Sequence, residues 1–360
     1  MLQKYEEISC GTPVALEPVM NCKDFKEAAF ESVRVEAPAR LHLGFLDLNG
    51  NLGRRFGSLG LAIEEIATEV EISTAATLQV EGPAGARGRV LSCAASLIEQ
   101  LGLPQGAAIR IKRVIPDHVG LGSGTQLSLA VAAAMSTLYG LDLETRQMAG
   151  LLKRGMRSGI GIGAFDTGGF LVDGGRGERD DPPPVIMQSD FPEAWRLLLI
   201  FDRRGPGIHG AQELAAFKAL PPFPAQHAAD LCRLVLMQVL PALAEGDCRR
   251  FGQGIGRLQE VVGDHFAPAQ SGRFASPEVA EVLAWLKAQE ISGIGQSSWG
   301  PTGFAILDSE AGARQLLHAM QFRYADRPNL SFALTRARNH GSRIQTRKKP
   351  ASRVTLYTAM

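Results

Sequence analysis

The sequence predicts a soluble α+β protein built from two domains. Residues 33–48 and 59–73 alternate apolar and polar side chains with the period of a β-strand. A glycine-rich loop then opens directly into a helix of small residues. The proline run "DDPPP" at 180–184 is typical of a linker between two halves. At 360 residues, 45% of them hydrophobic, the chain is long enough for two domains that share a cleft.

The first half is expected to form one mixed domain over residues 33–185. Residues 1–32 have weak periodicity and are interpreted as an N-terminal extension. In the first strand, Leu41, Leu43 and Phe45 alternate with residues suited to a polar, cleft-facing side. After the two strands we expect a helix at 90–102, a strand at 107–115, and helices at 125–139 and 143–155.

The second half is expected to form an α+β domain over residues 186–345. Its elements are predicted as a strand at 195–202, a long helix at 225–243 broken near Pro241, helices at 249–261 and 277–287, a strand at 303–308, a further helix, and a last strand at 330–335. Residues 346–360 form a basic tail, which we interpret as solvated rather than as a nucleic-acid site.

Composition excludes several classes of function. The net charge is +1, from 38 basic and 37 acidic residues, which argues against nucleic-acid or membrane partners. The five cysteines are scattered and lack CxxC spacing, so no metal site on sulfur is expected. No signal peptide is evident and no apolar run approaches about 20 residues, so we expect a cytoplasmic protein.

The loop "GLGSGTQ" is the clearest candidate binding element. Glycines let the backbone approach a ligand, and the first turn of a helix offers unpaired N–H groups and a partial positive charge. The lysine of a P-loop is absent, and a plain strand-to-helix turn is the alternative. The Thr125 hydroxyl could also meet Mg²⁺. The predicted phosphate-binding residues are Gly120, Gly122, Ser123, Gly124, Thr125 and Gln126.

Three segments in order resemble the motifs of the GHMP kinase superfamily. They are "APARLHLGFLD" at 37–47, "P-x3-GLGS" before the small-residue helix, and "GIGQSSWGPTGFAIL" at 293–307. The resemblance implies a ribosomal-S5-like N-terminal domain and a ferredoxin-like C-terminal domain. However, Gly124 replaces a hydroxyl residue that the kinases often use with Mg²⁺. An ATP-dependent small-molecule kinase therefore remains the alternative function, and a regulatory protein that lost its chemistry is a second one.

These departures resemble one branch, the β-ribofuranosylaminobenzene 5'-phosphate synthases of tetrahydromethanopterin biosynthesis. Five segments carry the resemblance: "RLHLGFLDLNGNLGR", "GLGSGTQ", "RSGIGIGAFDTGGFLVDGG", "GPGIHGAQELAAF" and "GIGQSSWGPT". It implies a Mg²⁺-assisted transfer of the phosphoribosyl group from 5-phosphoribosyl 1-diphosphate to 4-aminobenzoate or 4-hydroxybenzoate, with release of diphosphate and CO2. It also implies a homodimer.

The site residues follow from this chemistry. A carboxylate could stabilise positive charge at the ribose C1. We predict that Asp166 is this carboxylate, because it lies where the resembled kinases keep their catalytic aspartate, and Asp47 is the second candidate. His42 is predicted to be a substrate ligand. Guanidinium groups suit phosphate or carboxylate, and Trp299 could stack on an aromatic ring. The predicted substrate-binding residues are Arg40, Arg54, Arg157, Gln296, Ser297, Ser298, Trp299 and Thr302.

Each of these residues also has a structural alternative. Asp166 could cap a turn among glycines, and His42 could be a hydrogen-bonded core residue. Each arginine could form a surface ion pair, and Trp299 could belong to the core.

Overall fold

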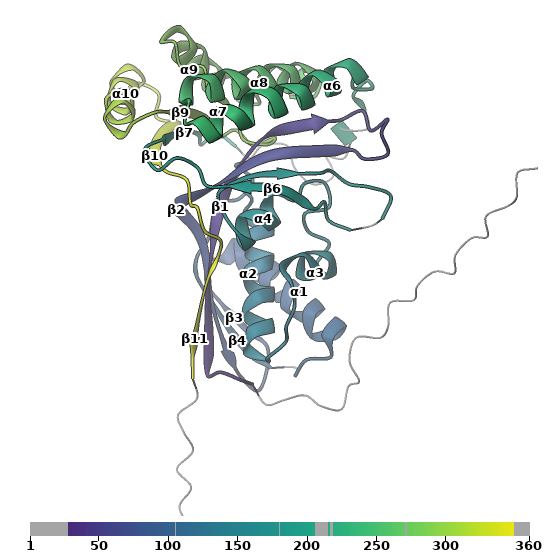
Figure 1. Cartoon of the computed structure of the whole chain (residues 1–360). Coiled ribbons are helices and arrows are strands. Elements are labelled where there is room, and N and C mark those ends of the chain that lie inside the picture. Colours follow the sequence, from purple (N-terminus) through teal and green to yellow (C-terminus); the bar gives the residue numbers. More distant parts are fainter. Residues whose placement is uncertain are drawn as a thin grey trace, which may run out of the picture.

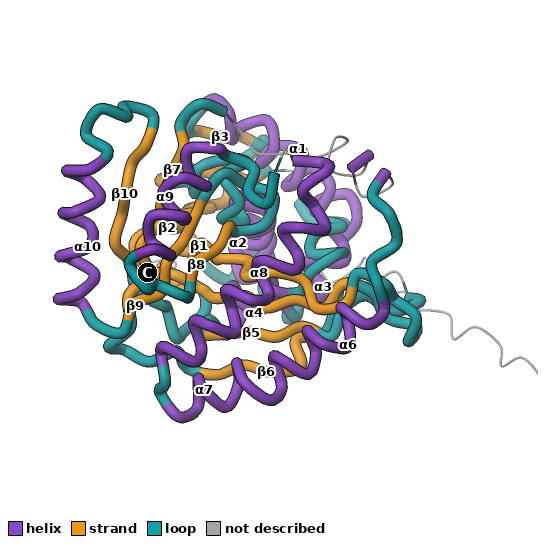
Figure 2. Tube along the Cα trace, turned by 90° about the horizontal axis from the view of Figure 1, so that it is seen from above, coloured by secondary structure: helices purple, strands orange, loops and turns teal. Residues whose placement is uncertain are grey.

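Two β-sheets, each covered by helices, build the protein (Figure 1). The computed structural model describes residues 28–104, 106–179, 181–205, 215–216, 219–270 and 272–348. In Figure 1 the first sheet begins in the lower part and its longest strands reach up beneath the helices of residues 225–270, which lie in the upper part. Seen from above, α10 lies at one end of the upper part and α6 at the other (Figure 2).

The first sheet has seven strands, with β11, β1, β2, β4 and β3 side by side and β5 pairing with β2 and β6. Their bounds are β1 Ser32–Asp47, β2 Phe56–Thr74, β3 Gln79–Glu81, β4 Ala107–Arg113, β5 Phe170–Asp173, β6 Val185–Ser189 and β11 Arg343–Arg347. The helices are α1 Ala84–Leu101, α2 Ser123–Leu138, α3 Thr145–Leu151 and α4 Ile160–Asp166.

The long first strand belongs to two hydrophobic cores. Val33 and Val35 pack with α1 and α2 in the core of the first domain. Leu41 and Leu43 pack instead in a core shared with α6 and α8. The pairing of β1 with β2 shifts register between Pro38 and Ala39. Because a register irregularity bends and twists a strand, it lets one strand turn from one core to the other.

The second sheet has the order β10, β7, β9, β8, with bounds β7 Arg196–Asp202, β8 Ile294–Gln296, β9 Gly303–Leu307 and β10 Leu330–Thr335. The central strand β7 is apolar on both faces because both are covered. Leu198 and Ile200 face α9 and α10, while Leu197 and Leu199 face α6 and α8. The helices are α6 Ala225–Leu234, the π-helical turn η1 Val235–Val239, α7 Leu240–Glu245, α8 Cys248–Gln270, α9 Pro277–Ala288 and α10 Glu310–Arg323.

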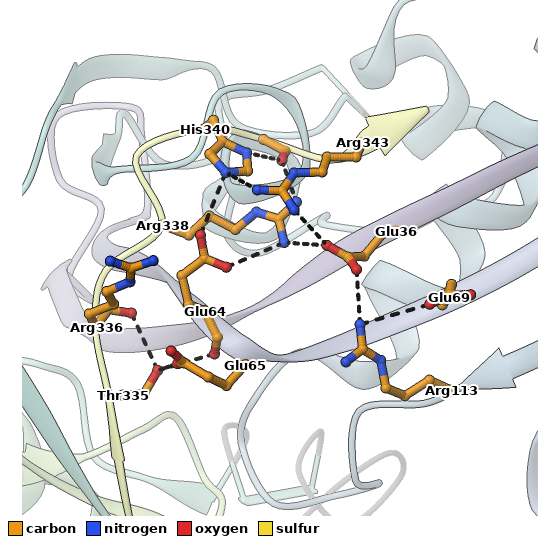
Figure 3. A network of polar contacts seen from close by, with 11 residues as sticks. Glu36, Glu64, Glu65, Glu69, Arg113, Thr335, Arg336, Arg338, His340 and Arg343 are labelled. Carbon is orange, nitrogen blue, oxygen red and sulfur yellow. Dashed lines mark hydrogen bonds and ion pairs between the residues drawn. The ribbon is translucent and has the colours of Figure 1, made fainter. Parts of the chain in front are cut away.

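After β10 the chain returns to the first domain, where a polar network holds it (Figure 3). The buried guanidinium of Arg338 donates to Glu36 of β1 at 2.7 Å and lies 3.8 Å from Glu64 of β2. The final strand β11 then pairs with β1 from Ser32 to Glu36. The C-terminal part of the described chain is therefore part of the first sheet.

This return corrects the predicted domain boundaries. Residues 343–347 lie in the first sheet, whereas 186–345 were predicted to form the second domain and 346–360 a tail. Strand β6 also extends the first sheet to Ser189, beyond the predicted end at 185. The first error concerns a strand whose partner, β1, lies far away in sequence, whereas β6 pairs with the preceding strand β5.

One stretch of the described chain, Ala225–Glu245, is long and apolar enough to cross a membrane by length and composition alone. The π-helical turn interrupts it ahead of Pro241, where a break was predicted. Ala228, Leu231, Val235 and Val239 from this stretch pack into the hydrophobic core. Only 33% of its most apolar window is buried, so the stretch packs one face on the core and leaves the other exposed.

Candidate active site

The three glycine-containing motifs meet at the hydroxyl of Ser297. This side chain is fully buried between the two domains. Its Oγ accepts a hydrogen bond from the His42 backbone N–H at 3.0 Å and donates to the Gly120 carbonyl at 2.7 Å. Strand β1, the loop before α2 and the turn after β8 are thereby joined at one point. Because its single O–H donor is used and the side chain is fully buried, Ser297 supports the site from within and is not placed to contact a ligand.

Glycines make this contact possible because the two backbones touch. Gly120 has φ +88°, and a Cβ there would lie 2.1 Å from the Ser297 carbonyl oxygen. A Cβ on Gly300 would lie 2.2 Å from the carbonyl carbon of Val119. Contacts this short are excluded, so both positions require glycine.

The first turn of α2 is open to a ligand. Gly122 is its N-cap at φ +83°, and the first intrahelical bond runs from the Gln126 N–H to the Gly122 carbonyl. The N–H groups of Ser123, Gly124 and Thr125 precede that bond, so the helix does not use them. A Cβ on Gly124 would meet no atom within 4 Å. This geometry suits an anion, as the sequence predicted.

Two arginines lie beside this helix mouth. The Arg40 guanidinium donates to the Gly120 carbonyl and packs against Gly122, where a Cβ would lie 3.3 Å from three of its atoms. Arg40 and Arg157 both act electrostatically on the His42 ring and disfavour its protonation. Arg40 therefore lies at the helix mouth and Arg157 lies near enough to His42 to affect it; that either binds substrate stays a prediction.

His42 is a buried and neutral histidine. Its side chain packs against Phe45 with ring centroids 4.6 Å apart, and Nε2 has no hydrogen-bond partner in the part of the chain that the structure describes. Burial, followed by the positive charge of Arg40, lowers the pKa of His42 to about 3. At neutral pH the imidazole can accept or donate one hydrogen bond but cannot supply positive charge.

A small pocket of about 30 Å³ lies beside His42. Its aromatic wall consists of Phe45, Phe266 and Trp299, and Ser298 lies at the same pocket. Trp299 is 4% exposed and packs against Phe266 with ring centroids 4.5 Å apart. Trp299 is thus a core residue that also lines the pocket. Its place in the core is one of the two alternatives considered from the sequence, and stacking on a substrate ring stays a prediction.

The remaining residues of the third motif support the turn. The Gln296 amide nitrogen donates to the Ser298 carbonyl at 2.9 Å, and its Oε1 accepts from the Ala275 N–H at 2.6 Å. Thr302 is fully buried, and its backbone carbonyl accepts from the Ser297 N–H at 2.9 Å. Ser298, half-buried at φ +56°, is the member of this turn best placed to meet a ligand.

The structure does not bring Asp166 to the helix mouth. Asp166 is the exposed last residue of α4 and accepts a hydrogen bond from the Thr145 hydroxyl at 2.8 Å. Helix α4 meets the mouth of α2 at its other end, where Gly161 packs on Thr125. Five residues of helix separate the two points, about 7.5 Å along the axis. This position does not support the catalytic role, and the hydrogen bond found is to a side chain of α3 and not the cap of a glycine turn offered as the alternative.

Three other predicted residues also serve local structure. Asp47 accepts hydrogen bonds from two backbone N–H groups of the β1–β2 turn, Asn49 and Gly50, both at 2.8 Å. The exposed Arg54 donates to the carbonyls of residues 174 and 175. The Gln126 amide donates to the Gly161 carbonyl at 2.7 Å and so joins α2 to α4. The segment 205–217, quoted for the resemblance, lies almost entirely outside the described residues.

The sequence reasoning missed Asp173. This fully buried carboxylate ends β5 and accepts hydrogen bonds from Ser58, Ser158 and two backbone N–H groups. Burial raises the pKa of Asp173 above its ordinary value, while those hydrogen bonds act in the opposite direction. The available signal was an acid directly after an apolar strand and before two glycines, in the segment "FLVDGG".

Comparisons with known proteins agree with this architecture. Residues 89–174 match the family model for the GHMP kinases N terminal domain, and residues 239–326 match the one for the GHMP kinases C terminal. A β-ribofuranosylphenol 5'-phosphate synthase from Archaeoglobus fulgidus is 36% identical over 328 residues, which cover 87% of this chain and 99% of the relative. The enzyme of that name from Methanocaldococcus jannaschii is 33% identical, over 77% of this chain and 90% of the relative.

Solved structures show the same fold at low identity. Mevalonate diphosphate decarboxylase from Staphylococcus aureus matches with a TM-score of 0.64 at 15% identity, over 88% of this chain and 98% of that one. Homoserine kinase from Cytophaga hutchinsonii matches with a TM-score of 0.59 at 18% identity, over 90% of this chain and all of that one. Motifs, fold and relatives agree: the chain belongs to the β-ribofuranosylphenol 5'-phosphate synthase family of enzymes, within the GHMP kinase superfamily.

Proposed function

We propose that this enzyme transfers the 5-phosphoribosyl group of 5-phosphoribosyl 1-diphosphate to a 4-substituted benzoate, releasing diphosphate and CO2. The product would be a C-riboside for tetrahydromethanopterin biosynthesis. The relatives are named for a ribosylated phenol, which favours 4-hydroxybenzoate over 4-aminobenzoate as the acceptor. The observation that carries the proposal is the open mouth of α2 with Arg40 beside it.

The helix mouth is suited to a departing diphosphate. Three backbone N–H groups, from Ser123 to Thr125, are held in place before the reaction starts. Arg40 adds positive charge at the same loop. Donors and charges that need no rearrangement stabilise a leaving anion most effectively. Asp166 lies at the end of α4 away from the helix mouth and Asp47 is engaged by the β1–β2 turn, so we assign the balancing of positive charge at C1 to the departing diphosphate.

The acceptor needs no base at the reacting carbon. The ring carbon that bears the carboxylate attacks C1 of the ribose while the C1–O bond to diphosphate breaks. The resulting cationic ring regains aromaticity when its C–CO2 bond breaks and the electron pair returns to the ring. One displacement inverts the α-configured donor to a β product, so a covalent enzyme intermediate is unnecessary. His42 and the aromatic wall would orient the ring across the mouth of the pocket, which is too small to enclose it.

Mg²⁺ fits this site only together with the substrate. Within the described residues no group of three or more His, Cys, Asp or Glu side chains could hold a metal ion. Mg²⁺ commonly keeps phosphate oxygens and waters as ligands, so the diphosphate would supply most of them and the Thr125 hydroxyl one more. When bound, the ion would neutralise charge on the leaving group.

The kinase alternative makes an opposite prediction about the donor. The purified protein is incubated with Mg²⁺ and 4-hydroxybenzoate, with either 5-phosphoribosyl 1-diphosphate or ATP, and phosphorus NMR follows the products. Diphosphate release that requires the ribosyl donor supports the proposal. Turnover of ATP with phosphorylation of a small alcohol or sugar, and none of the ribosyl donor, would refute it. 4-Aminobenzoate is run in parallel to rank the two acceptors.

A further inference from the structure

A buried carboxylate outside the predicted site is tied to the segment that carries Arg157. The Oδ2 atom of Asp173 accepts hydrogen bonds from the Ser158 hydroxyl at 3.1 Å and from the Gly159 N–H at 3.0 Å. The Ser58 hydroxyl donates to the same oxygen, and the Gly175 N–H donates to Oδ1 at 2.8 Å. Asp173 itself is 0% exposed. Two of its four donors therefore belong to residues that directly follow Arg157.

This segment enters the site immediately beyond those hydrogen bonds. Gly159 is the N-cap of α4, and Gly161 packs on Thr125 so closely that a Cβ there would lie 3.0 Å from the Thr125 methyl. Arg157, on the other side of the anchor, acts electrostatically on His42. A shift of residues 157–161 would thus disturb the packing on Thr125 at the helix mouth and the charge that acts on His42.

Stability alone does not explain a carboxylate at this position. Burying a charge among neutral donors costs free energy, and among the described residues Asp173 forms no ion pair to offset it. The two backbone N–H groups, of Gly159 and Gly175, donate to different oxygens of Asp173, so either orientation of an amide would place its NH2 group against one of these donors. A carboxylate is the side chain that can accept from all of them at once.

We propose that Asp173 is a positioning residue of the active site, which fixes residues 157–161 so that Gly161 stays packed on Thr125 at the mouth of α2 and Arg157 stays near His42. What binds at that mouth rests on the proposed function. The anchoring itself is a property of the folded chain. It can therefore be measured without turnover.

The test combines hydrogen exchange with ligand binding. In Asp173→Asn, and to a smaller extent in Ser158→Ala, the amides of residues 157–165 should exchange faster than in the wild type. The Kd for inorganic diphosphate with Mg²⁺, measured by calorimetry, should rise about tenfold in Asp173→Asn, the size expected when hydrogen bonds to a charged group are lost. Ser136→Ala is the control, because it removes a hydrogen bond to the Leu141 carbonyl in the same domain without touching residues 157–161, and it should leave both readouts unchanged.

A double-mutant cycle with Arg157→Ala separates positioning from general destabilisation. If Asp173 acts through the Arg157 segment, Asp173→Asn should add little to the Kd once Arg157 is removed. Equal effects with and without Arg157, or unchanged exchange at 157–165 in a folded variant, would overturn the proposal. Ser158→Ala carries the same test if Asp173→Asn does not fold. If the wild type binds no diphosphate, the proposed function is contradicted. The anchoring role of Asp173 is then decided by the hydrogen-exchange rates at residues 157–165 alone.

Discussion

Acid should destabilise this protein partly through a single buried residue, His42. Its pKa is lowered to about 3 in the folded state, first by burial and then by Arg40, whereas an exposed histidine in an unfolded chain titrates near 6.5. As the pH falls below about 6.5, His42 becomes protonated in the unfolded chain but stays neutral in the folded protein. Stability from this residue is therefore present above that pH and is lost as the pH falls toward about 3.

The size of the effect follows from the same two values. Between pH 7 and about pH 5.5, the unfolded histidine becomes about 90% protonated while the folded one stays neutral. The free energy of unfolding should fall by about 1.3 kcal/mol on this account, with a limiting slope of about 1.4 kcal/mol per pH unit. Burial also lowers the pKa of His265, so the wild type will show a larger total slope.

Urea unfolding at several pH values isolates the contribution of His42. His42→Gln keeps a polar side chain that does not titrate. Between pH 7 and about pH 5.5 its free energy of unfolding should therefore fall by about 1.3 kcal/mol less than that of the wild type. His318→Gln, which removes an exposed histidine, is the control and should keep the wild-type slope. If His42→Gln also kept that slope, His42 would be protonated in the folded protein. The neutral imidazole assigned to the site would then be wrong.

Three further outcomes follow from the contacts of the site. Gly120→Ala should lower the free energy of unfolding by about 2 kcal/mol or more, because this residue has a positive φ and touches the opposite backbone. Gly124→Ala, in open space, should leave that free energy unchanged or raise it. Urea unfolding measures both variants. Ser123→Ala and Thr125→Ala should each raise the KM for the ribosyl donor by about threefold to tenfold, and Thr125→Ser should retain the wild-type value if the hydroxyl is what matters. Asp166→Asn should keep turnover within about twofold of the wild-type value and lower the free energy of unfolding by at most about 1 kcal/mol. A loss of turnover of about a hundredfold or more would show that Asp166 is catalytic.

The sequence predicted those parts of the fold that depend on local patterns. The regions predicted as strands at 33–48 and 59–73 became β1 and β2, and the glycine loop before a small-residue helix became the open mouth of α2. Strand β11 was missed because residues 343–347 are exposed and carry no apolar pattern; pairing with β1 makes them a strand. Helix α4 was missed because glycines disfavour a helix, which here is fixed by tertiary contacts.

The candidate site was predicted less completely than the fold. Arg40, His42 and the α2 loop could be found because each lies inside a motif. The roles of Asp166 and Asp173 depend on which end of a seven-residue helix meets α2, and no local pattern reports that. Asp166 was favoured as an acid among glycines, yet the carboxylate that is buried beside the site is seven residues further along the chain.

The central claim is that phosphoribosyl transfer and decarboxylation occur together at this site. The most direct measurement uses 4-hydroxybenzoate labelled in its carboxyl carbon, with 5-phosphoribosyl 1-diphosphate and Mg²⁺, and follows labelled CO2 and diphosphate in the same reaction. The proposed reaction predicts equal amounts of both, each dependent on the ribosyl donor and both lost when Mg²⁺ is chelated. Diphosphate released while the label stays on the ribosylated product would contradict decarboxylative transfer.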